Sequence, residues 1–593
     1  MSLAMRSYRR TIEECDAILC APDMPYEMES RLVDGLMQRV YKNLWPSLRD
    51  FWLQSASQYR DQVYIVYGSE RHTYGAVLQR SLRAAAVFRD VYQIRKGDRV
   101  AICSRNLPEY LTAFWACQLL GAVAVLVNAW LPLEPLTHCL LHTGGKLILL
   151  DSERADRIAP AREKLTRNGA VGLIILDSHV LRSPRQGFDS WEDILKRSAS
   201  TRDDNESFNY PHVGPEDNAT VMFTSGTTGL PKGVLSTQRQ FLTNLRNATV
   251  GAARAILRTG GALPTPPTGP QKGVLIAVPF FHVSGLTSLS MLATMSGFKI
   301  VLMRKWDVPE AVRLIKEENV RIAGGIPMIV SDLVESKLAG YPLDTLLFGG
   351  SPAHDQLPSK GKRAFPSAVF QAYGMTETNS IAVALAGIDY EERPTAVGLP
   401  CPVNDVLIVD SQGKVLPRGE SGEVWLRGPD IMKCYWNDPE ATRKAITQDG
   451  WLKTGDLGYL DHDNFLYIRD RLKDLIIRGG ENIDSVSVEN AVLADDRVRE
   501  VAAVGVPDKR LGELVAVVVS PKPQYRHRVK EHEILQVARQ RLPKFAVPVM
   551  VVIHKDMFEL TPSGKIKKGP LRDLARLEWE RRRHLNSSTG SRL

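Results

Sequence analysis

The chain has 593 residues, too many for a single hydrophobic core, so several lobes are expected. With 44% apolar and 24% charged residues it has the composition of a globular protein, and its net charge of +9 is modest for its size. No run of Lys and Arg with interleaved aromatic residues indicates nucleic-acid binding. The seven scattered cysteines, without a CxxC, indicate reduced thiols and neither a disulfide framework nor a zinc site.

In chain order, residues 1–45 are mixed in charge and are predicted to form a helical lead. From residue 48 onward apolar runs alternate with longer mixed segments, as at 62–67, 99–103, 146–150 and 171–176. Continuous apolar runs are typical of parallel strands covered by helices on both faces. We therefore predict an α/β fold, with a large N-terminal domain of helix-covered sheets over residues 1–470.

Residues 111–130 contain no charged side chain and are long enough to suggest a membrane span. Gly121 divides the run into an amphipathic-looking helix, residues 109–120, and a β-branched stretch, residues 122–127. We predict a buried helix followed by a buried strand, and no transmembrane segment. The arginines near the N-terminus are followed at once by acidic residues, so no signal or transit peptide is expected.

A glycine- and hydroxyl-rich loop lies within residues 223–234, Phe-Thr-Ser-Gly-Thr-Thr-Gly-Leu-Pro-Lys-Gly-Val. Glycines let backbone N–H groups approach a ligand, and hydroxyls and a lysine add further donors, so the loop suits a polyphosphate. It is not a Walker loop, because Pro231-Lys232-Gly233 stands where Gly-Lys-Ser/Thr is needed. Taken alone, a loop of glycine, serine and threonine would favour a polar surface turn.

Three more strand ends carry polar or aromatic groups. Residues 275–285 run into Phe280, Phe281 and His282, residues 346–352 into a Gly-Gly turn, and residues 369–378 into Tyr-Gly-Met-Thr-Glu. A lone histidine beside a strand is often structural, and Glu377 alone could be a solvated acid.

Further on, residues 450–456 read Gly-Trp-Leu-Lys-Thr-Gly-Asp, and residues 467–483 carry Arg-Leu-Lys-Asp and Gly-Gly-Glu-Asn-Ile. Beyond them the chain changes to short alternating strands and helices, which predicts a small α+β domain over residues 471–585. Residues 560–568, Leu-Thr-Pro-Ser-Gly-Lys-Ile-Lys-Lys, form a glycine-containing loop that presents Lys565. The charged helix after Pro570 is expected to be a solvated face.

From about residue 48 to 571, these motifs and their order resemble the adenylate-forming superfamily, and their hinge motif is similar to that of fatty-acid and 4-coumarate-type CoA ligases. Ala372 departs from the common glycine, a tolerable change. The resemblance implies an ATP-dependent acyl-CoA ligase that uses ATP, Mg²⁺ and coenzyme A and forms an acyl-adenylate and then a thioester. It also implies that the small domain is mobile and rotates about Lys473.

The resemblance implies a role for each matched residue. The catalytic residues would be Lys565, Thr228, Glu377 and His282, with Glu377 and Thr228 as the metal ligands. His282 would border the acyl pocket, and Lys565 would bridge the carboxylate and the α-phosphate. The nucleotide and coenzyme A would be held by Ser225, Gly226, Thr227, Thr228, Gly229, Lys232, Gly349, Gly350, Ser351, Tyr373, Gly374, Thr376, Asp456, Arg471, Lys473, Gly479, Gly480 and Lys565.

The pocket candidates are mostly apolar or small: Phe281, His282, Gly285, Gly325, Phe348 and Met375. They favour a medium- or long-chain fatty acid or a related acid over acetate. An aryl acid or a dedicated acid of secondary metabolism is also compatible as the substrate. Two other functions are less favoured: adenylation with a carrier protein as the acceptor, and a non-catalytic sensor of acyl groups or nucleotides. The sequence ends in Ser591-Arg592-Leu593, a variant of the peroxisomal address, on a polar tail of residues 586–593. We therefore expect a peroxisomal import receptor as a partner and a peroxisomal location, and a cytoplasmic one otherwise.

Overall fold

The computed structural model describes residues 8–199, 210–224, 230–263, 269–350, 357–365, 367–479, 481–561 and 565–589. The chain packs as two compact units. The first comprises Met1–Gly350, Pro358–Val406 and Leu426–Leu452, and the second Ser351–Leu357, Leu407–Trp425 and Lys453–Leu593. The predicted boundary at residue 470 falls inside the second unit and stays a prediction. The tripeptide Ser591-Arg592-Leu593 lies outside the described residues.

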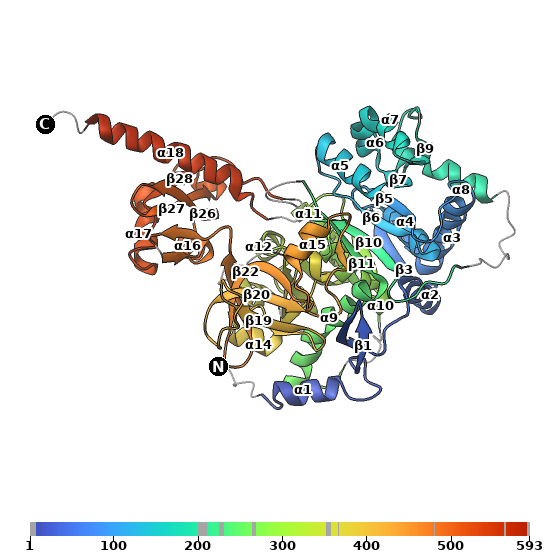
Figure 1. Cartoon of the computed structure of the whole chain (residues 1–593), viewed down its shortest axis with the longest axis horizontal. Coiled ribbons are helices and arrows are strands. Elements are labelled where there is room, and N and C mark those ends of the chain that lie inside the picture. Colours follow the sequence, from blue (N-terminus) through green and yellow to red (C-terminus); the bar gives the residue numbers. More distant parts are fainter. Residues whose placement is uncertain are drawn as a thin grey trace. The chain divides into compact units, whose positions relative to one another are not determined.

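The first unit contains an eight-stranded sheet whose central strands are parallel (Figure 1). At one edge of the sheet, β11 pairs antiparallel with both β10 and β21. In sheet order the strands are β21 (Cys434–Tyr435), β11 (Gly233–Thr237), β10 (Asn218–Phe223), β6 (Val123–Leu126), β5 (Arg99–Cys103), β7 (Leu147–Leu150), β8 (Gly172–Ile175) and β9 (Asp189–Ser190).

A second, nine-stranded sheet of the first unit is parallel from β3 to β16 and antiparallel at both edges. Its order is β18 (Leu399–Pro400), β17 (Val383–Ala386), β16 (Ala368–Tyr373), β15 (Thr345–Gly349), β14 (Val320–Gly325), β12 (Gly273–Ile276), β13 (Lys299–Leu302), β3 (Val63–Tyr67) and β4 (Glu70–Thr73). The two sheets confirm the predicted α/β class, since buried apolar strands need helices on both faces.

Helices pack around these sheets. They are α1 (Ile12–Leu19), α2 (Leu48–Gln58), α3 (Tyr74–Asp90), α4 (Pro108–Leu120), α5 (Leu133–Thr143), α6 (Ser152–Ile158), α7 (Arg162–Arg167), α8 (Trp191–Ala199), α9 (Gln238–Arg258), α10 (Met291–Ser296), α11 (Val308–Glu317), α12 (Pro327–Val334), α13 (Leu357–Ala364), α14 (Gly387–Glu392) and α15 (Pro439–Ala445), with a π-helix, η3, at Ser284–Ser290.

The uncharged run at 111–130 is the buried helix α4 followed by β6, as predicted. Every residue of α4 is buried, so the helix is not amphipathic and has no solvent face. Gly121 ends it in a left-handed conformation with φ of 65°. None of the helices that the structure describes is long and apolar enough to cross a membrane.

The N-terminal segment corrects one prediction. Residues 1–45 contain α1 but also a two-stranded hairpin, β1 (Met28–Val33) and β2 (Leu36–Tyr41). Asp34 and Gly35 connect its strands with φ of 48° and 83°. Positive φ at both central residues is the requirement of a type I′ turn, which Asp-Gly meets.

The second unit carries the α+β arrangement predicted for the C-terminal part. Its five-stranded sheet consists of β25 (Glu481–Ile483), β24 (Ile476–Arg478), β27 (Gly512–Pro521), β26 (Val498–Asp508) and β28 (Met550–Ile553). Three helices pack on it: α16 (Ser485–Leu493), α17 (Glu531–Arg541) and α18 (Lys568–Thr589), the last drawn red in Figure 1. A four-stranded sheet formed largely by this unit has the order β19 (Asp405–Val409), β20 (Gly422–Arg427), β22 (Leu452–Leu460) and β23 (Leu466–Arg471).

Candidate active site

The predicted site residues of the first unit follow the carboxyl ends of parallel strands. The glycine-rich loop follows β10, the aromatic-His segment β12, the Gly-Gly turn β15, and the Tyr-Gly-Met-Thr-Glu segment β16. In open α/β sheets ligands bind beyond these strand ends. The topology therefore puts the motifs where a ligand site is expected.

The glycine-rich loop connects β10 to β11. Its residues Ser225, Gly226, Thr227, Thr228 and Gly229 lie outside the described residues. The base of the loop is closed by Thr224 N–H, which donates to the carbonyl of Lys232 at 2.9 Å. The side chain of Lys232 is exposed. The loop is thus held at both ends by a paired antiparallel ladder.

The predicted adenine end is formed by neighbouring strands. Gly349 of β15 pairs with Ala372 of β16, next to Tyr373, and Gly350 follows with φ of 83°. Gly374 has no room for a side chain, because a Cβ there would lie 1.5 Å from the carbonyl oxygen of Ser380. Ser351 lies outside the described residues. Glycine is therefore required at 374 by a tight turn.

Glu377 follows that turn with Thr376 and is 7% exposed. Its Oε1 accepts a hydrogen bond from the Tyr435 hydroxyl at 2.7 Å. Carboxylate oxygen is the ligand type that Mg²⁺ prefers, together with waters and substrate phosphates. The donor chemistry at Glu377 fits the implied Mg²⁺. The second predicted ligand, Thr228, lies outside the described residues.

Behind this turn lies a buried carboxyl group, Asp430, that sequence reasoning missed. Its Oδ1 accepts from Asn404 Nδ2 at 2.6 Å, and its backbone carbonyl accepts from Asn379 Nδ2 at 2.9 Å. Burial raises the pKa of Asp430 to about 7, against the lowering by the Asn404 hydrogen bond. The backbone carbonyl of Asp430 thus holds Asn379, two residues after Glu377.

The aromatic-His segment is held by Asn106, which follows β5. Asn106 donates to the Val278 carbonyl at 3.0 Å and accepts from Phe280 N–H at 2.9 Å. Phe281 is buried, and the rings of Phe281 and His282 lie 5.1 Å apart. The backbone carbonyl of His282 accepts from Leu286 N–H at 3.0 Å.

Two glycines of the predicted acyl pocket have structural explanations. A Cβ on Gly285 would lie 2.2 Å from the Pro279 carbonyl oxygen, so this glycine permits backbone packing and leaves no depth on that side. Gly325 pairs with Phe348 at the end of β14 and faces Val278, with φ of 134°. Backbone packing therefore accounts for glycine at 285, and its place in an acyl pocket stays a prediction.

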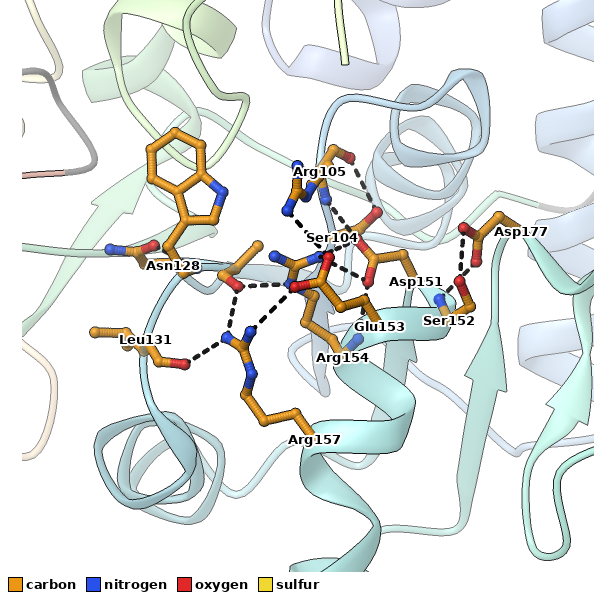
Figure 2. Close-up of polar contacts among 12 residues, drawn as sticks. Ser104, Arg105, Asn128, Leu131, Asp151, Ser152, Glu153, Arg154, Arg157 and Asp177 are labelled. Atoms are coloured by element: carbon orange, nitrogen blue, oxygen red, sulfur yellow. Dashed lines mark hydrogen bonds and ion pairs between the residues drawn. The ribbon is translucent and has the colours of Figure 1, made fainter. Parts of the chain in front are cut away.

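Figure 2 shows a polar network at the carboxyl ends of β5 and β7. Fully buried Arg154 donates through Nε to the carbonyl of Ala129 at 2.6 Å and through Nη1 to Asp151 at 3.2 Å. Arg157 donates to the carbonyls of Ala129 and Leu131 at 3.2 and 2.8 Å. The two guanidinium groups fix the loop that follows β6.

That loop carries Trp130, whose ring meets Phe281 edge-on with centroids 5.5 Å apart. The arginine network therefore connects the ends of the eight-stranded sheet to the aromatic-His segment. Sequence reasoning missed it. The available signal was Asp151, which directly follows an apolar strand and caps the helix that carries both arginines.

The remaining predicted residues belong to the second unit. Asp456 and Arg471 face each other across β22 and β23, and Arg471 Nε lies 3.1 Å from Asp456 Oδ1. Burial, and then the charge of Arg471, lower the pKa of Lys473 below its ordinary value. Gly479 has φ of 60° and its N–H donates to the Leu511 carbonyl at 2.7 Å. Gly480 lies outside the described residues.

Lys565 lies on a short hairpin before α18. Its N–H donates to Thr561 Oγ1 at 3.0 Å, and its carbonyl accepts from Thr561 N–H at 2.6 Å. Leu560 and Ile566 form a bridge across the hairpin. Thr561 therefore holds both the N–H and the carbonyl of Lys565.

Three residues beyond it, Lys568 is enclosed in a network. Its Nζ lies 2.6 Å from Ser485 Oγ and 2.7 Å from Glu489 Oε1. Ser485 N–H in turn donates to Asp470 Oδ2 at 2.5 Å. Burial alone would lower the pKa of Lys568, but Glu489 and Asp470 raise it above its ordinary value.

The fold and these motifs together define an adenylate-forming enzyme. The chain matches the family described as AMP-binding enzyme over residues 52–436, and the AMP-binding enzyme C-terminal domain over residues 487–565. It belongs to this AMP-binding enzyme family. Its class is that of the AMP-forming acid–CoA ligases, whose reaction requires ATP, Mg²⁺ and coenzyme A.

Three relatives illustrate the similarity. The chain is 32% identical to a feruloyl-CoA synthase of Amycolatopsis sp, covering 85% of this chain and 94% of that protein. It is 31% identical to a long-chain-fatty-acid–CoA ligase of Mycobacterium tuberculosis, covering 87% and 95%. Among solved structures it resembles the o-succinylbenzoate coenzyme A synthetase of Bacillus subtilis in complex with ATP and magnesium ion, with a TM-score of 0.70, 29% identity, and coverage of 90% and 99%.

Proposed function

We propose that this ligase activates a medium- or long-chain fatty acid or a related apolar carboxylic acid. The observation that carries the proposal is the apolar character of the strand ends beside the aromatic-His segment. Val278, Phe281 and Phe348 are buried there, and Gly325 lies between the first and the last of them. Burying an apolar tail against such groups contributes about 25 cal/mol per Å².

The proposed reaction has two steps. The substrate carboxylate attacks the α-phosphorus of ATP, the bond to the bridging oxygen breaks, and pyrophosphate leaves. The thiol of coenzyme A then attacks the acyl carbon, loses its proton, and AMP leaves. Charge develops on phosphate oxygens in the first step, so positioned cations and donors supply most of the catalysis.

Each predicted site residue would act by binding or orienting a substrate. Lys565 would neutralise the carboxylate and α-phosphate oxygens, Lys232 the terminal phosphates, and Asp456 would accept from the ribose hydroxyls. Glu377 would hold Mg²⁺, which shields phosphate charge when bound. A carboxylate substrate is already ionised at neutral pH, so His282 is proposed to position the acid and not to act as a base.

Acid-dependent exchange of pyrophosphate into ATP tests the first step, with octanoate, palmitate, ferulate, o-succinylbenzoate and acetate as the panel. Thioester formation is followed separately by adding coenzyme A. We expect the highest kcat/KM with octanoate or palmitate and little exchange with acetate. Exchange that is fastest with acetate would refute the assignment to an apolar acid.

An aryl acid is the second candidate. It is favoured by the edge-on contact of Trp130 with Phe281 and by the similarity to a feruloyl-CoA synthase. Aromatic pairs add about 0.5–1.5 kcal/mol beyond burial, and a substrate ring could extend the contact. Ferulate giving the highest kcat/KM would select this candidate.

Import into peroxisomes through Ser591-Arg592-Leu593 stays a prediction, which deletion of the tripeptide and imaging would test.

A further inference from the structure

A short edge strand, β21, connects two parts of the candidate phosphate end. Tyr435 pairs with Val234 on β11, the strand that follows the glycine-rich loop, and Trp436 N–H donates to the Gly233 carbonyl at 2.7 Å. On its other side, Met432 N–H donates to the carbonyl of Glu377 at 2.7 Å. The backbone of residues 432–436 therefore ties the Glu377 turn to the base of the loop.

The side chain of Tyr435 makes the same connection. Its hydroxyl donates to Glu377 Oε1 at 2.7 Å, and Lys232 Nζ lies 4.9 Å from the centre of its ring. A hydrogen bond to an ionised carboxylate is about twice as strong as a neutral one, and an ammonium over an aromatic face is attracted to it. One side chain thus contacts a candidate metal ligand and a candidate phosphate-binding cation.

The phenol hydroxyl is placed as a donor to this carboxylate. The ring of Tyr435 is buried, so packing keeps the hydroxyl in place. The hydroxyl fixes Oε1 of Glu377, while the other carboxylate oxygen is not engaged by a hydrogen bond among the residues that the structure describes.

We propose that Tyr435 is a positioning residue for the polyphosphate end of the site: its hydroxyl orients the Glu377 carboxylate toward the cation of Mg·ATP, and its ring holds Lys232 beside the same phosphates. This inference rests on the proposed function, because Mg·ATP is the ligand. It predicts that loss of the hydroxyl weakens the dependence on Mg²⁺ specifically, whereas loss of the ring also weakens the contact of Lys232 with ATP.

The test compares Tyr435→Phe and Tyr435→Leu in the full chain. Tyr26→Phe is the matched control, because it removes a buried hydroxyl that contacts Thr249 Oγ1 at 2.8 Å, in the same unit. The Mg²⁺ concentration for half-maximal pyrophosphate exchange is measured at saturating acid, and ATP binding is measured by calorimetry with Mg²⁺ and with EDTA. Thermal denaturation reports the fold of each variant.

For Tyr435→Phe we expect the half-maximal Mg²⁺ concentration to rise about tenfold, with kcat at saturating Mg²⁺ within about threefold of wild type. Its affinity for ATP in EDTA should stay within twofold of that of wild type. Adding Mg²⁺ should no longer increase this affinity as it does in wild type. Tyr435→Leu should also bind ATP more weakly in EDTA, and Tyr26→Phe should change neither quantity. In a Glu377→Gln background, Tyr435→Phe should have no further effect.

The proposal is overturned if Tyr435→Phe keeps a wild-type Mg²⁺ dependence, or if its ATP affinity falls equally with Mg²⁺ and with EDTA. It is also overturned if the effect persists undiminished in the Glu377→Gln background. Failure of the proposed function would give a different result: the wild-type protein would bind ATP with Mg²⁺ in calorimetry but show no exchange with any acid of the panel.

Discussion

Removing the ammonium of Lys568 should destabilise the second unit, and the expected cost can be worked from its contacts. Its Nζ lies 2.7 Å from Glu489 Oε1, and both side chains are 17% exposed. At an effective dielectric constant of 20 the attraction is about 6 kcal/mol, which the desolvation of two ions largely cancels. Lys568→Met leaves Glu489 without its cation and should cost about 3 kcal/mol.

The measurement is hydrogen exchange of peptides from α16 and β26 in the full chain, because it reports the opening free energy of this region alone. The double variant Lys568→Met/Glu489→Gln should recover to within about 1 kcal/mol of wild type. The glutamine still accepts the hydrogen bond that Ala503 N–H donates to Glu489 Oε1 at 2.9 Å. The control is Lys567→Met, since Lys567 is 39% exposed and pairs with exposed Glu559, which predicts less than about 1 kcal/mol.

The cost should also depend on pH. Burial raises the pKa of Glu489, and Lys568 opposes this rise. In Lys568→Met the raised pKa lets the folded state keep a proton that the unfolded state releases, so stability falls as pH rises above about 4.5. The variant should therefore lose less at pH 5.5 than at pH 8. The reasoning would be refuted if the costs of Lys568→Met and Glu489→Gln simply add in the double variant. It would also be refuted if the cost of Lys568→Met does not change with pH.

The remaining predictions address other parts of the site. Lys565→Ala should slow adenylation at least about 100-fold yet still convert supplied acyl-adenylate to thioester, and equal loss in both half-reactions would contradict its role. Burial raises the pKa of Asp430 to about 7, so the contribution of this group to stability should fall as pH rises from about 4 to 7 and level off above that. The stability of Asp430→Asn relative to wild type should therefore rise across that range in thermal denaturation, and a difference that does not change with pH would exclude this role of Asp430. Gly374→Ala should cost about 1–3 kcal/mol in denaturant titrations, because its Cβ meets the Ser380 carbonyl oxygen, and a wild-type midpoint would show that the turn adapts. Arg154→Met leaves buried Asp151 without its cation, so the free energy of unfolding should drop by about 3 kcal/mol. The KM for the acid should also rise, because the loop that carries Trp130 loses the hydrogen bond from Arg154 to Ala129. An unchanged KM would show that the network does not affect binding of the acid.

Much of the fold was predictable from local pattern. Apolar runs such as residues 99–103 and 146–150 became parallel strands, because a strand buried on both faces needs no polar residue. The uncharged run around Gly121 was also assigned correctly as a helix and a strand. The hairpin of residues 28–41 was missed although Asp34-Gly35 is a strong hairpin signal, since its strands alternate poorly and expose Leu32 and Met37.

The candidate site was predictable only where a residue belongs to a motif. Lys567 and Lys568 are identical neighbours in the sequence, yet one is at the surface and the other is enclosed. The difference comes from Glu489, about 80 residues earlier, which no local pattern connects to Lys568. Tyr435 and Arg154 were missed for the same reason, because their partners are set by tertiary packing. The roles of Ser225, Thr228 and Gly480 stay predictions.

The pairing of β21 with β11 has a consequence for how the protein is made. Val234 and Tyr435 are about 200 residues apart along the chain. At 5–20 residues per second, a ribosome needs about 10–40 s to produce the intervening segment. During that interval β11 is an unpaired sheet edge, open to pairing with another chain. The phosphate end of the site can therefore be completed only after Tyr435 has been synthesised. Nascent chains that stop short of Tyr435 should depend on chaperones to stay soluble.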